Sequence, residues 1–363
     1  MTALKRAKFD DRLLPVSSAR QAASAAWHLA EAQMTKLDEL LIDHCNVSGI
    51  VGEAARYHLQ TGSKRFRPKF LLAASAAVNA NHNHARRVAT AVELLHNASL
   101  VHDDLQNKDE FRRGHKTVWR RYGTEMAINL GDYFISSTYS ALARIAGNGD
   151  MLSRLVALFA ESTGQIIAGQ SEEIQMTRQV SISPDAYHRI ARGKSGVLMA
   201  LPVVAALMIA DADLQTIGAA RRAMENLGIA YQIQDDLADV MGKKDGRKAG
   251  VDLREGRMSL PIIHFMAVAD RAERRIFEKI IASQAEPESN AFSACLKKLR
   301  TSEAIGICQS EIDLTLHNAF DQIASLPPVL RETIALGMKT VISAMDKLDG
   351  GVGWGRQQGQ RIL

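Results

Sequence analysis

The sequence is poor in the residues that cross-link a chain or carry it through a membrane. Its 363 residues include only three cysteines, which are widely spaced and predict neither a disulfide framework nor a zinc site. The longest apolar run, 197–210, contains Pro202 and is too short to span a bilayer. The first ten residues, MTALKRAKFD, lack the apolar core of a secretory signal. We therefore expect a cytoplasmic protein without a transmembrane segment.

Proline and aromatic residues are also scarce, and this scarcity favours helix over strand. Only eight prolines occur, with none between Pro68 and Pro184, so long helices can form without interruption. Aromatic residues make up 5%, and alternating runs typical of strands are hard to find. We predict an all-α fold with one helical domain over residues 21–350, an N-terminal tail (1–20) and a C-terminal tail (351–363).

The net charge is too small to indicate a nucleic-acid partner. Lysine and arginine number 45, aspartate and glutamate number 40, and the formal net charge is +5. Charges that cluster within such a chain would instead suit small anionic ligands.

A first group of carboxylates ends a helix that should be buried. Residues 88–101 are apolar on most faces of a helix, yet Asp103 and Asp104 follow directly. Unpaired buried carboxylates are costly, so this conflict predicts a functional site. Asp109 lies six residues after Asp103, about 240° around a helix. The two can converge only if the helix bends or ends near residues 106–108.

A second group of carboxylates follows another apolar segment. Asp235 and Asp239 are four residues apart and share one helix face, with Asp236 beside them. A cation between them would reverse their repulsion, and Mg²⁺ prefers hard oxygen ligands and commonly bridges carboxylates to phosphates. Either group alone would be interpreted as solvated surface or helix caps. Two groups together favour a metal site, and neither has the glycine or final glutamate of an EF-hand.

Basic residues accompany both acidic groups. Arginine binds phosphate as a planar fork and lysine binds it as a point charge. Each base alone could be a solvated loop charge, but acid for a metal and base for phosphate together indicate a diphosphate substrate. No P-loop motif surrounds any of them. The basic positions are Lys64, Arg65, Arg67, Arg112, Arg113, Lys194, Lys248, Arg254 and Arg257.

The segments that contain these acidic and basic residues resemble those of the trans-prenyltransferases, which are also called isoprenyl diphosphate synthases and form the polyprenyl synthetase family. Within this family they resemble the bacterial geranylgeranyl diphosphate synthases. The resemblance implies an all-α bundle around a deep central cavity, the isoprenoid synthase type I fold, and a homodimer. It also implies Mg²⁺-dependent head-to-tail (1′-4) condensation of isopentenyl diphosphate with dimethylallyl, geranyl or farnesyl diphosphate. The resembling segments, within about residues 62–261, are G-S-K-R-F-R-P, E-L-L-H-N-A-S-L-V-H-D-D-L-Q-N-K-D-E-F-R-R-G, G-D-Y-F, K-S-G, Y-Q-I-Q-D-D-L-A-D and D-L-R-E-G-R-M-S-L-P.

The resemblance implies roles for individual residues. Mg²⁺, at about three ions per active site and with Mn²⁺ as a substitute, would be held by Asp103, Asp104, Asp109, Asp235, Asp236 and Asp239. Isopentenyl diphosphate would be bound by Lys64, Arg67, His96 and Arg113. The allylic diphosphate would face Arg112, Lys194 and Gln232. Further substrate-binding residues would be Ser195, Arg247, Lys248 and Arg257. These six aspartates, together with Arg112 and Lys194, would also take part in catalysis.

Several positions depart from the family pattern. Arg247 and Arg257 stand where the family has lysine, and arginine keeps the charge but changes the shape. The adjacent Lys248 could substitute for the family lysine at position 247. Ser195 replaces a threonine and keeps the hydroxyl. His96 lies on an apolar helix, where a histidine is usually a satisfied core residue; the resemblance makes it a ligand.

Small residues before the first aspartates suggest the product length. In the family, a bulky aromatic residue at this place closes the cavity at farnesyl diphosphate (C15), whereas Ala98 and Ser99 are both small. We predict growth to geranylgeranyl diphosphate (C20), with C25 or longer, or a farnesyl product, as alternatives.

Other function classes stay open from the sequence. A class I terpene cyclase would also ionise a diphosphate with Mg²⁺, but it typically carries an N-S-E-type motif in place of the second aspartate group. A non-catalytic subunit of a heteromeric synthase would usually have lost one aspartate group. A plain helical scaffold would not explain six carboxylates flanked by bases.

Overall fold

The computed structural model describes residues 18–348, except 148, 178, 180–181, 244–247 and 284–288. The described chain is built of helices, with two strands, β1 (Phe111–Arg112) and β2 (His115–Lys116), in one short antiparallel hairpin. The all-α prediction is therefore confirmed. The proposed tails, 1–20 and 351–363, lie almost entirely outside the described residues.

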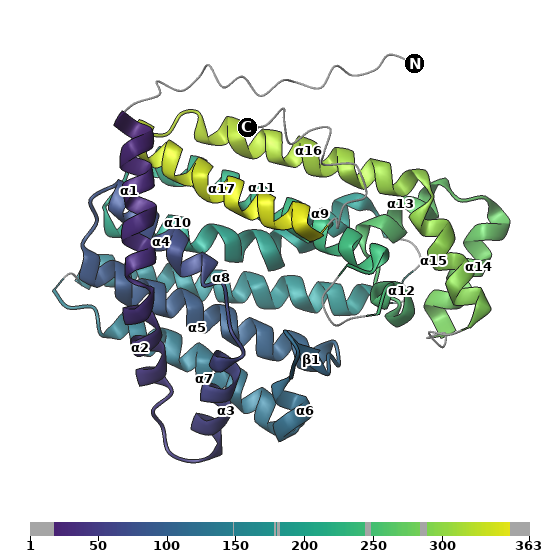
Figure 1. Cartoon of the computed structure of the whole chain (residues 1–363), viewed down its shortest axis with the longest axis horizontal. Coiled ribbons are helices and arrows are strands. Elements are labelled where there is room, and N and C mark those ends of the chain that lie inside the picture. Colours follow the sequence, from purple (N-terminus) through teal and green to yellow (C-terminus); the bar gives the residue numbers. More distant parts are fainter. Residues whose placement is uncertain are drawn as a thin grey trace.

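The helices follow one another with short connections, and the longest lie side by side through the middle of the molecule (Figure 1). The first are α1 (Ser18–Ala32), α2 (Met34–His44), α3 (Ile50–Gln60), α4 (Phe66–Ala77), α5 (His82–Gln106), α6 (Val118–Tyr122), α7 (Thr124–Ala143) and α8 (Gly149–Met176). The next are α9 (Pro184–Ala191), the π-helical turn η2 (Arg192–Gly196), α10 (Val197–Ile209), α11 (Leu214–Met241), α12 (Val251–Glu255) and α13 (Leu260–Val268). The last are α14 (Arg271–Ser283), α15 (Asn290–Arg300), α16 (Glu303–Ile323) and α17 (Pro328–Leu348).

Two apolar clusters hold these helices together. The larger runs from Ala30 to Met345 and includes α10, in which every residue from 197 to 207 is buried. A helix that is apolar on all faces is stable only when other elements surround it. The smaller cluster lies under α14 and α15, where the Phe265 and Phe277 rings stack with centroids 4.1 Å apart.

One described helix has the length and composition of a membrane span. It runs through α9, η2 and α10 from Pro184 to Ile209, and 67% of its most apolar window is buried inside the protein. Core helices pass the same test, so the finding is weak evidence for a span. The apolar run 197–210 is only part of this helix, which also includes α9 and η2.

The π-helical turn η2 is held between α8 and α11 by glycines. A Cβ atom on Gly169 of α8 would lie 2.9 Å from the Lys194 backbone nitrogen. A Cβ atom on Gly228 of α11 would lie 2.6 Å from the Gly196 Cα atom. Only glycine therefore lets the two helices approach the turn this closely. Single π turns inside α-helices are rare and frequent at functional sites.

The β1–β2 hairpin follows the first aspartates and turns sharply. Arg112 pairs with His115, and the chain reverses through Arg113 and Gly114. Both turn residues have positive φ, 52° and 78°, as a type I′ turn requires. A non-glycine residue at positive φ is strained, and such residues gather at functional sites.

Two glycines of α8 should respond oppositely to substitution by alanine. A Cβ on Gly164 meets nothing within 4 Å, so Gly164→Ala should raise the free energy of unfolding by about 0.5–1 kcal/mol. Gly169→Ala overpacks against η2 and should lower it by about 1–3 kcal/mol. Urea unfolding followed by circular dichroism measures both values. Equal shifts for the two variants would contradict the close packing of α8 on η2.

His58 of α3 should make the stability depend on pH. Burial, helped by the nearby Arg112 and Arg113 charges, lowers the pKa of His58 from 6.5 to about 3. Between these values the unfolded chain binds a proton that the folded chain does not, so the free energy of unfolding falls as the pH drops from 6.5 toward 3. One such group contributes a slope of at most about 1.4 kcal/mol per pH unit.

Urea unfolding at several pH values tests this pH dependence. His58→Leu should reduce the slope of the unfolding free energy against pH, because the titrating group is gone. The reduction should be equivalent to at most one bound proton. Parallel curves for the variant and the unchanged protein would show that His58 is not a source of the acid sensitivity.

Candidate active site

A cavity of about 820 Å³ opens among the central helices. Its walls come from α1, α4, α5, α8, α9, η2, α10, α11, α12 and α17, with the β1–β2 hairpin and the segment that follows α12. On α5 and at its C-cap, Asn107, the lining residues His96, Leu100, Asp103 and Asn107 recur every three or four positions. This spacing places them on one helix face, so α5 presents a polar stripe to the cavity.

The first two aspartates are each paired with a base. Arg112 Nε lies 2.8 and 2.9 Å from the two carboxylate oxygens of Asp104, which is 1% exposed. Lys194 Nζ lies 3.0 Å from Asp103 Oδ1. Burial alone would raise the pKa of Asp103, but the Lys194 and Arg112 charges outweigh burial and lower it. Asp103 is therefore an ionised carboxylate in the cavity wall, and Asp104 fixes the arginine beside it.

The third aspartate of the predicted group, Asp109, is not among the residues that line the cavity. α5 ends before Asn107, as the convergence of Asp103 and Asp109 required. Asp109 is nevertheless only 8% exposed, and its main chain anchors the β1–β2 hairpin. The Asp109 carbonyl accepts the Thr117 hydroxyl at 2.6 Å and the Trp119 indole N–H at 2.8 Å. Asn107 lines the cavity instead, four residues after Asp103. The spacing of four residues between Asp103 and Asn107 places both on one helix face, and this was the feature of the sequence that could have identified Asn107.

The aspartates of the second group differ in what they contact. Asp235 and Asp236 both line the cavity from α11. Asp236 Oδ2 accepts the Tyr187 hydroxyl at 2.7 Å and the Leu260 N–H at 3.2 Å. Asp236 Oδ1 accepts the Gln232 amide at 3.0 Å. Three donors from three elements therefore fix the Asp236 carboxylate.

Asp239 fixes the start of α12. Its two carboxylate oxygens accept the N–H groups of Val251 at 3.3 Å and Asp252 at 3.1 Å. Arg257, after α12, lines the cavity and pairs with Glu255 at 2.6 Å and Asp252 at 3.4 Å. Burial alone would lower the pKa of Arg257, but the two carboxylates outweigh burial and raise it. Asp239 thus holds the segment that brings a cationic arginine to the cavity.

Lys194 of η2 lies between two carboxylates. Its Nζ contacts Asp103 and, at 2.7 Å, Glu173 of α8. Burial alone would lower the pKa of Lys194, but these carboxylates outweigh burial and raise it. The next residue, Ser195, donates its hydroxyl to Gln232 at 2.7 Å and so joins η2 to α11. Glu173 belongs to no motif in the sequence, and only the packing of α8 on η2 reveals it.

A basic corner of the cavity is formed by Arg67 of α4 and His96 of α5, whose Nη1 and Nε2 atoms are 3.1 Å apart. Burial lowers the pKa of both residues, and nearby arginines bring that of His96 well below its usual value. His96 is therefore neutral. Arg67 Nε and His96 Nδ1 are buried without a hydrogen-bond partner among the described residues. Buried donors in this state indicate a site for an anionic ligand.

The other predicted phosphate ligands are placed unevenly. Lys64 and Arg113 line the cavity and are exposed. Arg65 also lines the cavity, but ion pairs within the protein hold its guanidinium. Lys248 is exposed and is not among the lining residues. Arg247 lies outside the described residues.

The residues predicted to set the product length lie behind the cavity wall. Ala98 is 1% exposed, and the Ser99 hydroxyl donates to the His96 carbonyl at 2.7 Å. Neither is among the residues that line the cavity, whereas Leu100 is. Their role in chain length stays a prediction.

The donor set suits Mg²⁺ when a phosphate completes it. Within the part of the chain that the structure describes, no three Asp, Glu, His or Cys side chains lie close enough to hold an ion by themselves. Mg²⁺ usually binds proteins through one or two carboxylates, with waters and substrate phosphates as the other ligands. Asp103 and Asp235 line the same cavity and supply such oxygens. The residues present therefore fit Mg²⁺ that is shared with a diphosphate.

Known proteins share both the sequence pattern and the fold. The chain is 33% identical over 260 residues to the geranylgeranyl pyrophosphate synthase of Geoglobus acetivorans, covering 70% of this chain and 78% of that protein. It is 29% identical over 273 residues to the geranylgeranyl diphosphate synthase of Saccharolobus solfataricus, covering 73% and 82%. The crystal structure of geranylgeranyl pyrophosphate synthetase from Pyrococcus horikoshii matches with a TM-score of 0.77 at 27% identity, covering 88% and 98%.

Other relatives are named for other products. A (2E,6E)-farnesyl diphosphate synthase of Mycobacterium tuberculosis is 31% identical over 215 residues, 59% of each chain. An all-trans-nonaprenyl-diphosphate synthase of Rhodobacter capsulatus is 28% identical, covering 77% of this chain and 84% of that protein. A heptaprenyl diphosphate synthase component 2 of Geobacillus stearothermophilus is 28% identical, covering 77% and 85%. These names share a reaction type and differ in chain length.

The family model matches a long, continuous part of the chain. Residues 48–299 match the model for polyprenyl synthetases, and this range contains all of the aspartates and basic residues of the cavity wall. The chain therefore belongs to the polyprenyl synthetase family and is a prenyltransferase.

Proposed function

We propose that the enzyme condenses isopentenyl diphosphate head-to-tail with an allylic diphosphate, depends on Mg²⁺, and releases geranylgeranyl diphosphate. One observation carries the proposal. A single cavity contains carboxylates at Asp103 and Asp235 and, in a different part of its wall, the basic pair Arg67 and His96 with buried unpartnered donors. A reaction between two diphosphates needs both kinds of site, because one diphosphate must leave and the other must stay.

The acidic part of the wall suits the allylic diphosphate. Asp103, Asp235 and the amide oxygen of Asn107 would hold Mg²⁺ against its phosphates. When bound, Mg²⁺ neutralises the charge that develops on the leaving diphosphate. Lys194 and Arg112 would exchange part of their contact with the carboxylates for phosphate oxygens, since both bind either anion.

The other four aspartates would act by positioning. Asp104 fixes the fork of a cavity arginine, and the main chain of Asp109 fixes the hairpin. Asp236 accepts from three donors, and Asp239 fixes the start of α12. Groups that orient the residues in contact with a metal are often needed almost as much as those residues themselves.

The basic corner suits isopentenyl diphosphate. Arg67 Nε and neutral His96 Nδ1 can each donate to a phosphate oxygen without first losing a partner in the protein. Lys64 and Arg113 are exposed at the cavity and can add charge to the same phosphates. No metal is required at this diphosphate, because it does not leave.

The chemistry then follows from charge and exclusion of water. The allylic carbon–oxygen bond breaks, and cationic side chains stabilise the departing diphosphate. The double bond of isopentenyl diphosphate attacks the carbocation, a carbon–carbon bond forms, and a proton leaves to the released diphosphate. The apolar lining, which includes Leu100, Ile190 and Met199, keeps water from the carbocation. No nucleophilic side chain is required.

The product length rests on two supporting observations. Ala98 and Ser99 are small, and two of the relatives reported above are named geranylgeranyl synthases. A longer product (C25 or more) or farnesyl diphosphate is the alternative, because other relatives carry such names.

A homodimer is the proposed assembly. Ile128 of α7 and Val156, Ile167 and Ile174 of α8 are 38% to 54% exposed, and exposed apolar side chains of this kind mark association surfaces. A heteromeric synthase is the alternative, because one relative is named as a component. Sedimentation of the purified chain at the mass of one copy would reject the homodimer.

The decisive experiment is elongation by the purified chain. With Mg²⁺ and labelled isopentenyl diphosphate, we expect C20 product from dimethylallyl, geranyl and farnesyl diphosphate, and none after chelation of the metal. The products are dephosphorylated and sized by chromatography. Failure to elongate any primer would reject the synthase. A cyclic hydrocarbon would indicate a terpene cyclase, and activity only with a second protein would indicate a subunit.

Asn107 and Asp109 should differ sharply in the same assay. Asn107→Ala removes a cavity oxygen and should lower kcat/KM for the allylic diphosphate by about 10–100-fold. Asp109→Asn preserves the main-chain bonds that anchor the hairpin but removes a charge that acts on Arg112 and Arg257, so it should lower kcat/KM by a smaller factor than Asn107→Ala. Asn107→Asp keeps an oxygen at the position and serves as the control, with activity retained. A larger loss of activity in Asp109→Asn than in Asn107→Ala would indicate that Asp109 binds the metal.

A further inference from the structure

We propose that Glu311 of α16, outside the cavity, is a positioning residue that fixes the allylic side of the active site by clamping α9 to α13. The inference rests on the proposed function, because it assigns the allylic diphosphate to the wall that contains Asp103 and Asp235. Glu311 is not among the residues that line the cavity. It acts through two histidines and the donors beside them.

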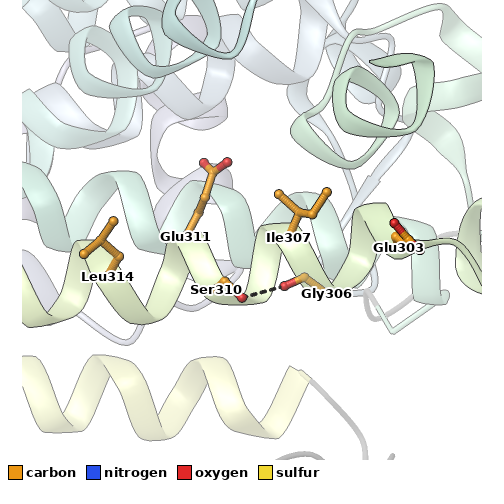
Figure 2. Close-up of a pocket in the computed structure, with 6 residues that line it drawn as sticks. All are labelled: Glu303, Gly306, Ile307, Ser310, Glu311 and Leu314. Atoms are coloured by element: carbon orange, nitrogen blue, oxygen red, sulfur yellow. Dashed lines mark hydrogen bonds between the residues drawn. The ribbon is translucent and has the colours of Figure 1, made fainter. Parts of the chain in front are cut away.

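Glu311 joins three helices that are far apart in the sequence. Its Oε2 lies 2.8 Å from His188 Nε2 of α9, and its Oε1 lies 2.6 Å from His264 Nε2 of α13. In Figure 2 the Glu311 carboxylate leaves α16 on the side away from Ser310, which bonds to its own helix at Gly306. The side chains are 11% to 30% exposed, so water competes weakly for these contacts.

Each histidine stands next to a donor that holds Asp236. Tyr187 directly precedes His188 on α9, and its hydroxyl donates to Asp236 Oδ2 at 2.7 Å. Leu260 lies one turn before His264 on α13, and its N–H donates to the same oxygen at 3.2 Å. Two donors can meet at one oxygen only if α9 and α13 keep a fixed separation. Glu311 sets that separation, because each of its oxygens holds one of the two helices.

The same clamp extends to Lys194. α9 continues without a break into η2, which carries Lys194 and Ser195. Ser195 bonds to Gln232, and Gln232 bonds to Asp236, so α9, η2 and α11 form one connected network. A shift of α9 would therefore displace the groups assigned to the allylic diphosphate. The basic corner stands on α4 and α5, so the isopentenyl side should be affected less.

A carboxylate is the group that this arrangement requires. An ionised carboxylate accepts a hydrogen bond at each oxygen, so it can bind two imidazole N–H groups at once. A glutamine offers one acceptor and one donor, and can satisfy both rings only if one changes tautomer. Glu311 also borders a shallow surface pocket of about 480 Å³ with Glu303. Both Glu311 oxygens are already engaged by histidine, which argues against a ligand role in that pocket.

The experiment compares Glu311→Ala with Glu303→Ala, a matched glutamate on the same helix and the same surface pocket. We expect Glu311→Ala to raise KM for the allylic diphosphate about threefold to tenfold and to leave KM for isopentenyl diphosphate within about twofold. Tyr187→Phe should shift the allylic KM in the same direction. Glu303→Ala should change neither constant.

A second readout does not depend on activity. In the metal-free protein, hydrogen–deuterium exchange of residues 184–196 should be faster in Glu311→Ala than in the unchanged protein, and unchanged in Glu303→Ala. Equal increases in both KM values, or no change in exchange, would overturn the clamp. If Glu311→Ala does not fold, Glu311→Met, which nearly keeps the side-chain volume and removes both acceptor oxygens, gives the same test. An inactive parent enzyme would reject the proposed function, and the exchange measurement would still decide the clamp.

Discussion

Carboxylates that are close together in a cavity need cationic partners before any metal or substrate binds. The contact between Lys194 and Asp103 supplies such a partner. Without the lysine, Asp103 would keep only the longer contact with Arg112, at 3.8 Å, to offset its partial desolvation. Arg112 does the same for Asp104. These bases also bind phosphate well. Arrival of a metal and a diphosphate is therefore an exchange of ionic partners, and neither state leaves a charge unpaired.

The sequence predicted what depends on local spacing. Long stretches without proline predicted the helices, and the four-residue spacing of Asp235 and Asp239 placed them on one helix, although only Asp235 lines the cavity. The sequence could not orient Asp109, because it lies past the end of α5, after Lys108 at a φ of 52°, and tertiary hydrogen bonds fix its main chain. Glu173 was missed because a distant helix supplies it.

Three of the five described non-glycine residues with positive φ are basic, and two of these three, Arg65 and Arg113, line the cavity. Arg65, Lys108 and Arg113 all have positive φ, between 47° and 52°, although none is glycine. Such conformations persist only when surrounding contacts determine them. Arg65 is held by ion pairs to Glu93 and Asp38. The strained backbone thus sets where the basic groups stand before any anion binds, which lowers the cost of ordering them later.

The glycine contacts around η2 have a consequence for how the enzyme moves. Gly169 and Gly228 bring two helices so close to this turn that its main chain has little room to shift while the Glu311 contacts hold α9. Lys194 must therefore pass between Asp103, Glu173 and a phosphate by rotation about its side-chain bonds alone. Such rotations take nanoseconds or less when they are unhindered, far faster than the microsecond to millisecond shifts of whole helices. Capture of the allylic diphosphate on this wall should then proceed without a hinge, at a pace limited by encounter with the substrate.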